Sequence, residues 1–159
     1  IEVYLDVETN WGRELTVVGF QSSVTGVIQL VGSEITTRRL RKELPREGRL
    51  FTYNGHCFDI CCVRKQLGID LQHQFESVDL RWICQRVGLR GGQKLIEQRI
   101  GHVRKCAEMD GLDAIRLWNE YEDGDRRALG VLLRYNAEDL TGLMKIKRHL
   151  SARGLLSNQ

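Results

Sequence analysis

Residues 1–8 alternate strictly between apolar and polar side chains, and this pattern constrains the fold more than any other stretch of the chain. A period of two is that of a β-strand, with Ile1, Val3, Leu5 and Val7 on one face and Glu2, Tyr4, Asp6 and Glu8 on the other. An apolar strand that opens a mixed sheet is usually central, where carboxylates are costly unless paired or bound to a cation. The polar face is therefore either a solvent-exposed edge face or a candidate cation site.

The order of the remaining patterns predicts an α/β fold. Two β-rich runs at 14–20 and 25–32 follow the first strand closely and predict an antiparallel meander. A helical segment at 36–44 stops at Pro45, and the strand expected at 49–54 would then lie parallel in the same sheet. Helices are expected at 56–68, 80–88, 92–100, 112–122 and 125–150, with a short extended piece at 75–78. Together these segments predict a mixed sheet flanked by helices.

Composition limits the class of protein. With 159 residues, 42% hydrophobic and 28% charged, we expect a single domain over residues 1–159 and neither a disordered tail nor a fibre. No apolar run approaches the roughly 20 residues that span a membrane, and the first residues do not read as an export signal. Five cysteines without a CxxC pair favour a reducing compartment, so we expect a cytoplasmic location. The start at Ile1 suggests a domain excised from a longer polypeptide, or one that works with a partner protein.

Two acidic segments lie in the first half of the chain. Asp6 and Glu8 share one face of the first strand, roughly 6 to 7 Å apart along it. Asp59 closes the segment NGHCFD, where a strand ends and a helix starts, so it falls in the first helical turn. An exposed edge face would explain the first pair, and ordinary helix N-terminal electrostatics would explain Asp59.

A third acidic segment, YNAED, lies in the last helix. Tyr135 and Asp139 are four residues apart and therefore stack on one helix face, with open space expected beside Gly142 one turn further on. A half-buried core tyrosine and an ordinary surface acid would be the simplest explanation of the pair.

Taken together, DVET, NGHCFD and YNAED resemble the three motifs of the DEDD superfamily of 3′ to 5′ exonucleases, with a tyrosine-type third motif. The chain is also similar to bacterial domains described as ribonuclease H-like predicted exonucleases. The resemblance spans residues 6–139 and implies a ribonuclease H-like mixed sheet, an antiparallel meander plus parallel strands. It implies hydrolysis of nucleic acid from a 3′ end. Single-stranded DNA is the expected substrate, RNA is the alternative substrate, and DNA repair is the expected process.

The resemblance also implies the roles of the acids. Two Mg²⁺ or Mn²⁺ ions would assist phosphodiester hydrolysis, since hard cations prefer carboxylates whereas zinc would prefer Cys and His. Asp6 would bridge both ions, Glu8 and Asp139 would complete the site of the ion that activates water, and Asp59 would hold the other ion. Tyr135 would orient the attacking water.

The substrate contacts are less defined by the sequence. Thr9, Trp11 and Asn54 are the expected nucleic-acid contacts, and Trp11 could either stack on a terminal base or cap the sheet edge. Basic residues at 38–49 and 145–153 could meet phosphates or form solvated faces, and the net charge of +3 does not decide between these.

Three further points stay open at this stage. Asp79 could join the acidic site or start a helix, while Trp82 and Trp118 lie in apolar helical patterns and read as core or helix-packing residues. Two other functions remain: a structure-selective endonuclease or RNA-trimming nuclease, and a non-catalytic nucleic-acid-binding module on the same fold.

Overall fold

The computed structural model describes residues 1–106 and 109–156, whose strands form one five-stranded mixed sheet in the order β3-β2-β1-β4-β5. The strands are β1 (Glu2–Thr9), β2 (Leu15–Ser22), β3 (Gly26–Val31), β4 (Arg49–Thr52) and β5 (Glu76–Asp79). The first three form an antiparallel meander, whereas β4 runs parallel to β1 and β5 runs parallel to β4. The predicted α/β fold with a mixed sheet is therefore confirmed.

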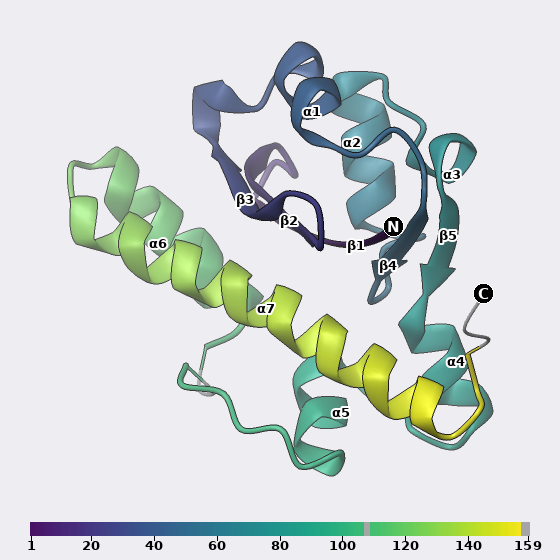
Figure 1. Cartoon of the computed structure of the whole chain (residues 1–159). Helices are drawn as coiled ribbons and strands as arrows, with labels where there is room; N and C mark the ends of the chain where they lie inside the picture. Colours follow the sequence, from purple (N-terminus) through teal and green to yellow (C-terminus); the bar gives the residue numbers. More distant parts are fainter. Residues whose placement is uncertain (107–108, 157–159) are drawn as a thin grey trace.

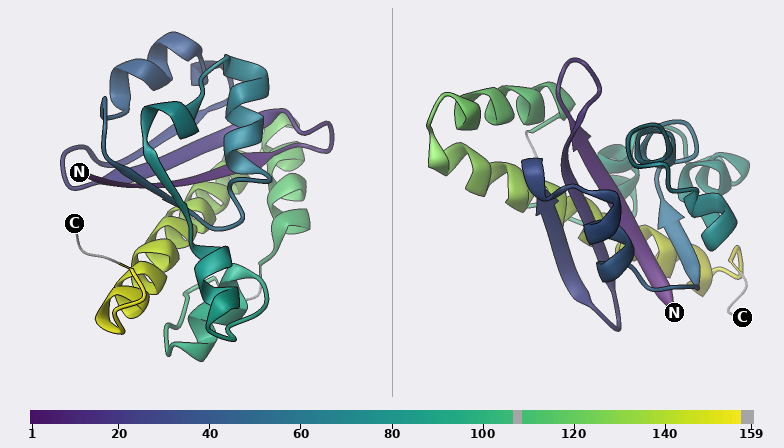
Figure 2. Two further views of the ribbon diagram at one scale, coloured as in Figure 1. Left: turned by 90° about the vertical axis from the view of Figure 1, so that its right-hand side faces the viewer. Right: turned by 90° about the horizontal axis from the view of Figure 1, so that it is seen from above.

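Helices cover both faces of this sheet (Figures 1 and 2). One face carries α1 (Thr37–Glu43), α2 (Asp59–Leu67) and α3 (Leu71–Gln74), and the other carries α4 (Leu80–Arg86), α5 (Gln93–Arg99), α6 (Gly111–Glu122) and α7 (Arg126–Ala152). A 3₁₀ turn, η1 (Gly32–Glu34), follows β3. The long α7 crosses the sheet beneath β1, β2 and β4 and brings its motif to the central strand. The sequence pattern predicted neither the 3₁₀ turn η1 nor the single-turn helix α3.

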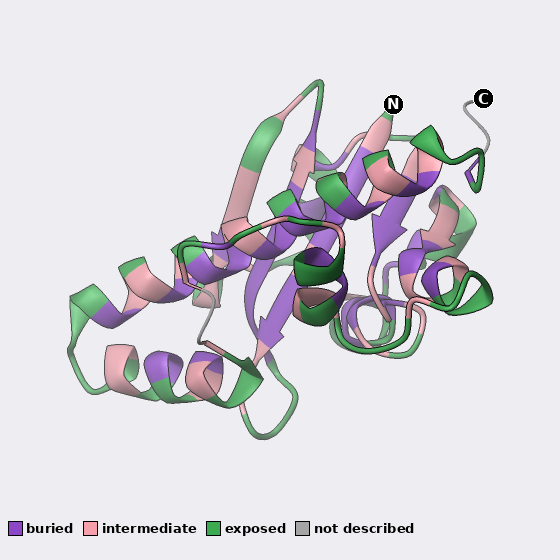
Figure 3. Cartoon of the chain, turned by 90° about the horizontal axis from the view of Figure 1, so that it is seen from below, coloured by how far each residue is buried: buried purple, intermediate pink, exposed green. Residues whose placement is uncertain are grey.

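The central strand β1 is covered on both faces. Val3, Leu5 and Val7 pack in the core shared with α1 and α2, while Tyr4 packs in the second core, under α7. Figure 3 shows the central strands mostly buried, whereas the edge strand β3 is largely intermediate or exposed and most other exposed residues lie on the outer turns of helices and in loops. The polar face of β1 is thus not a solvent-exposed edge face, and its acids need another explanation.

Two of the side-chain predictions are wrong and one is confirmed. Trp118 of α6 is 7% exposed and packs against α7, as predicted. Trp82 of α4 is 53% exposed, because this seven-residue helix buries only Leu80 and Cys84. The space expected beside Gly142 is filled by the carboxylate of Glu97.

Among residues 1–106 and 109–156, we find no helix with the length and apolar character needed to cross a lipid bilayer.

Candidate active site

Three carboxylates meet where β1 ends. Asp6 and Glu8 come from β1, and Asp139 comes from α7 as it passes beneath. One carboxylate oxygen of each lies within 4.8 Å of those of the other two. Glu8 is 9% exposed and Asp139 is 7% exposed, so this acidic group is largely withdrawn from water. A compact set of oxygen ligands is suited to Mg²⁺ or Mn²⁺.

Asp6 is held in place by Asn136, the residue after Tyr135. The Asn136 amide Nδ2 donates to Asp6 Oδ2 at 2.8 Å and to the Asp6 carbonyl at 3.1 Å. Asn136 Oδ1 accepts in turn from Gln29 Nε2 at 2.9 Å. Gly19 in β2 makes this possible, because a Cβ there would overlap the Asn136 amide. Sequence reasoning missed Asn136, although its place inside YNAED was a signal.

Asp59 approaches the same strand from the opposite side of the sheet. It is the first residue of α2, as predicted, and its Oδ1 accepts a hydrogen bond from the backbone N–H of Val7 at 2.9 Å. Among the described residues it does not belong to the compact three-carboxylate group, yet its charge acts on both Asp6 and Glu8. The structure therefore brings all four predicted acids to the end of β1.

The four acids carry more negative charge than their surroundings compensate. Burial, followed by repulsion from the other acids, raises the pKa of Asp6 and of Glu8 well above the ordinary range. Burial raises the pKa of Asp59 to about 7, and it raises the pKa of Asp139 to about 6 although Arg104 opposes this shift. Such a site favours protons or cations, so its residues fit divalent ions.

Two cations that sequence reasoning missed also reach the site. Arg104 Nη2 lies 2.6 Å from Asp139 Oδ1, and its side chain is 3% exposed. Lys94 of α5 places Nζ 4.6 Å from the centre of the Tyr135 ring, and burial lowers the pKa of this amine. Both lie outside the three motifs, in a region whose sequence offered no signal for either.

Tyr135 lies one helical turn before Asp139, as the spacing predicted. It is 6% exposed and packs with α6 residues. Burial and the charge of Asp139 raise the pKa of its hydroxyl, so the phenol stays protonated at neutral pH and can donate a hydrogen bond.

A groove of 280 Å³ opens beside Glu8. Thr9, Trp11 and Phe58 are among its lining residues, and the start of α6 closes its far side. Trp11 is 72% exposed in the loop after β1, so its ring is not buried against the sheet edge. The groove thus places a free aromatic face next to the carboxylates.

Asn54 and Asp79 build the turn that leads to α2. Asn54 has a positive φ of 63°, its backbone N–H donates to Asp79, and its Oδ1 accepts from Arg81 at 2.6 Å. Asp79 also accepts from the backbone N–H of Arg81 and caps α4. Asp79 is therefore the helix N-terminal acid, one of its two expected roles.

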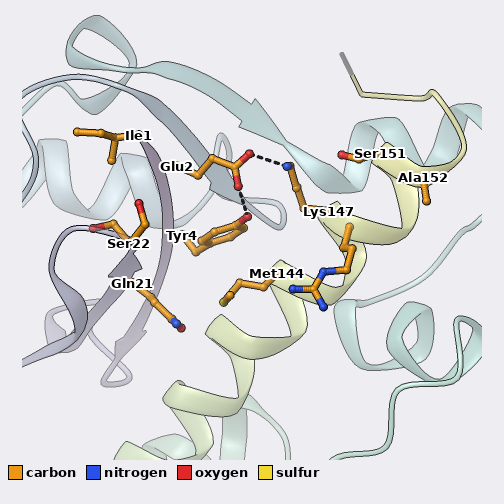
Figure 4. Close-up of a pocket in the computed structure, with 11 residues that line it drawn as sticks. Ile1, Glu2, Tyr4, Gln21, Ser22, Met144, Lys147, Ser151 and Ala152 are labelled. Carbon is orange, nitrogen blue, oxygen red and sulfur yellow. Dashed lines mark hydrogen bonds and ion pairs between the residues drawn. The ribbon is translucent and has the colours of Figure 1, made fainter. Parts of the chain in front are cut away.

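A larger cavity of 810 Å³ lies at the other end of β1, between Glu2 and the last turns of α7 (Figure 4). Here Glu2 forms an ion pair with Lys147 and accepts a hydrogen bond from the Tyr4 hydroxyl at 2.8 Å. Lys147 belongs to the basic segment at 145–153, and in this structure its partner is an acid of the same chain.

The strand order, together with acids from the central strand, from a strand-to-helix turn and from the last helix, defines a ribonuclease H-like protein. The family model described as the RNase_H superfamily matches residues 3–151, and the chain belongs to this family.

Comparison with solved structures points to the same fold. The chain is similar to the family B DNA polymerase from the hyperthermophilic archaeon Pyrobaculum calidifontis, with a TM-score of 0.70 and 13% sequence identity. The match covers 94% of this chain and 24% of the polymerase, so the chain spans about a quarter of that protein's length. No curated protein matches the chain.

Proposed function

We propose that the chain is a metal-dependent 3′ to 5′ exonuclease that acts on single-stranded nucleic acid, with single-stranded DNA as its substrate. The observation that carries this proposal is the group of Asp6, Glu8 and Asp139, whose carboxylate oxygens lie within 4.8 Å of one another, beside Asp59 and Tyr135. We further propose that residues 1–159 act as one catalytic domain in the cytoplasm, alone or with further domains or a partner protein.

Two Mg²⁺ or Mn²⁺ ions would supply a hydroxide nucleophile and stabilise charge on the attacking and leaving oxygens. Asp6 would contact both ions, Glu8 and Asp139 would complete the first ion site, and Asp59 would hold the second. The protonated Tyr135 hydroxyl would hold the attacking water by a hydrogen bond, because it lies one helical turn from Asp139.

The groove beside Glu8 would receive the terminal nucleotide. Its base would stack on Trp11, a contact worth about 1 to 3 kcal/mol, and Thr9 would contact the same nucleotide. Asn54, whose Oδ1 accepts a hydrogen bond from Arg81, would be a further nucleic-acid contact.

The test is digestion of 5′-labelled single-stranded DNA and RNA with Mg²⁺ or Mn²⁺, with Asp6→Ala run beside the wild-type protein. We expect a ladder that shortens from the 3′ end and disappears in the variant. A covalently closed circle tests for an endonuclease, because an exonuclease has no end from which to start. Cleavage of the circle, or of RNA alone, would replace the proposal with the corresponding nuclease. Binding without cleavage, unchanged by Asp139→Ala, would indicate a non-catalytic binding module.

A further inference from the structure

Behind Asp139 lies a buried ion network that the three motifs do not contain. Arg104 directs Nε and Nη2 to the two carboxylate oxygens of Glu97, and Nη2 also contacts Asp139 Oδ1 at 2.6 Å. The side chains of Glu97, Arg104 and Asp139 are 1%, 3% and 10% exposed. The two-point contact with Glu97 sets the orientation of the guanidinium. Moving Arg104 away would leave a buried charge without its partner, so the pair holds the guanidinium firmly.

The helix contact around Glu97 is built to accept this pair. Gln93 Nε2 donates to Glu97 Oε1 at 2.9 Å and to the Asp139 carbonyl at 2.8 Å, so α5 is tied to α7 at the site itself. Gly142 of α7 leaves the room that the Glu97 carboxylate occupies, since a Cβ there would overlap it. The position of Glu97, and through it that of Arg104, is set by close packing of the two helices.

The loop that carries Arg104 is attached to α7 a second time. The backbone N–H groups of Lys105 and Cys106 donate to the two carboxylate oxygens of Glu138, at 2.9 and 3.0 Å. Glu138 directly precedes Asp139. The backbone that follows Arg104 is therefore anchored on α7 beside Asp139, the residue that the Arg104 guanidinium contacts. Arg104 is therefore held from both its side chain and its backbone.

We propose that Arg104 is a positioning residue for the metal site: held by Glu97, it binds one carboxylate oxygen of Asp139 and leaves the other oxygen for a divalent ion. This inference rests on the proposed function, since it assigns a purpose to the same carboxylates. Ligating carboxylates are themselves commonly hydrogen-bonded, and loss of such a partner weakens metal binding about 10- to 100-fold. Arg104 stays in place when the ion binds, because the network anchors it independently of Asp139.

The test measures metal affinity directly, by calorimetric titration of Mn²⁺ and Mg²⁺ into the whole chain. The double variant Glu97→Leu/Arg104→Met removes one positive and one negative charge together, so the net charge of the buried network is unchanged, while Asp139 keeps its carboxylate and loses its guanidinium partner. We expect it to bind the ion about 10- to 100-fold more weakly than the wild type. Arg116→Met is the matched control, because Arg116 also pairs with two acids but is 57% exposed on α6. It should bind as the wild type does.

A second readout follows Arg104 itself. Its Nε–H resonance in NMR spectra should be protected from exchange in the ion-free protein and remain protected after Mg²⁺ is added. Loss of protection on adding Mg²⁺ would mean that the ion displaces the guanidinium, which would overturn the proposal. If the double variant does not fold, Glu97→Gln, which loosens the anchor, should still weaken ion binding.

The outcomes separate this inference from the proposed function. Equal or tighter ion binding by the double variant would overturn the positioning role alone and make Arg104 a competitor of the ion. No ion binding by the wild type would overturn the proposed function and this inference together.

Discussion

The two ends of β1 carry acids on the same face of one strand but in opposite electrostatic states. At the N-terminal end, hydrogen bonds from Lys147 and Tyr4 outweigh burial and lower the pKa of Glu2. At the C-terminal end, burial and mutual repulsion raise the pKa of Asp6 and Glu8. The larger cavity lies at the compensated end, at 810 Å³ against 280 Å³ beside Glu8. Uncompensated charge, and not cavity size, therefore distinguishes the candidate site from the other end of the strand.

The largest effect should come from Asp6→Asn. If Asp6 contacts both ions, the variant should lose at least about 1000-fold in kcat, since such ions supply several kcal/mol to the transition state. The same change should raise the Tm of the ion-free protein, because it removes repulsion among the acids. Kinetics on end-labelled DNA and thermal unfolding in EDTA measure the two effects. Turnover at the wild-type rate would refute the bridging role.

The second prediction concerns the pH dependence of stability without metal. The folded chain raises the pKa of Asp59 to about 7 and that of Asp139 to about 6, whereas the unfolded chain releases these protons near pH 4. The fold therefore binds more protons between pH 4 and 7, so this contribution to stability is fully present below about pH 4 and is lost as the pH rises through 7. We expect a loss of several kcal/mol, since each pH unit over which a folded-state proton is retained contributes about 1.4 kcal/mol.

Urea unfolding in EDTA across this pH range measures that loss, with Asp59→Asn as the matched variant that should flatten the slope. Glu2 acts in the opposite direction: its lowered pKa contributes stability above about pH 4.5 that is lost as the pH falls. A wild-type slope unchanged by Asp59→Asn would show that this acid is not forced into its neutral form.

Packing at the carboxylate end should be intolerant of even one methyl group. Gly142→Ala would push a Cβ into the Glu97 carboxylate and should cost about 1 to 3 kcal/mol. Gly130→Ala in the same helix meets open space and should instead stabilise by about 0.5 to 1 kcal/mol. The free energies of unfolding of the two variants decide this, and equal values would mean that α5 does not pack against α7 as described.

Tyr135→Phe should have a moderate effect. It removes one hydrogen bond to the attacking water, typically worth about 0.5 to 1.5 kcal/mol, so kcat should fall by up to about tenfold. Because the ring remains, the Tm should stay close to that of the wild type. An unchanged kcat would exclude Tyr135 from the reaction.

The smallest effect should come from the compensated end of β1. Glu2 is only half-buried, so Glu2→Gln should change stability by less than about 1 kcal/mol and leave cleavage unaltered. A large loss of activity in this variant would contradict the division between the two ends.

Local patterns in the sequence placed the acids on their strands and helices, but only the resemblance to a known family joined them into one candidate site. Alternation placed Asp6 and Glu8, a strand-to-helix turn placed Asp59, and helical spacing placed Tyr135 with Asp139. The alternation could not decide whether the polar face of β1 was open or covered, because that depends on where α7 packs.

The supporting residues could not be predicted, because their contacts join distant parts of the chain. Asn136 and Asp6 are 130 residues apart in the sequence, and they meet because α7 packs closely on β1 and on β2 at Gly19. Arg104 reaches Asp139 from a loop whose sequence has no regular pattern. The sequence suggested open space beside Gly142, because it does not show that α5 packs there. The prediction that Trp82 is buried was wrong for a related reason. An apolar pattern does not show how much of a short helix the neighbouring elements cover.

A calorimetric titration of Mn²⁺ into the ion-free chain at pH 7.5, comparing wild type, Asp6→Asn and Glu2→Gln, tests directly whether the acids of β1 bind metal. We expect the wild type to bind the ion, Asp6→Asn to abolish binding and Glu2→Gln to leave it unchanged. No binding by the wild type, or equal binding by the Asp6→Asn variant, would contradict the claim that Asp6 and Glu8 form part of a metal site.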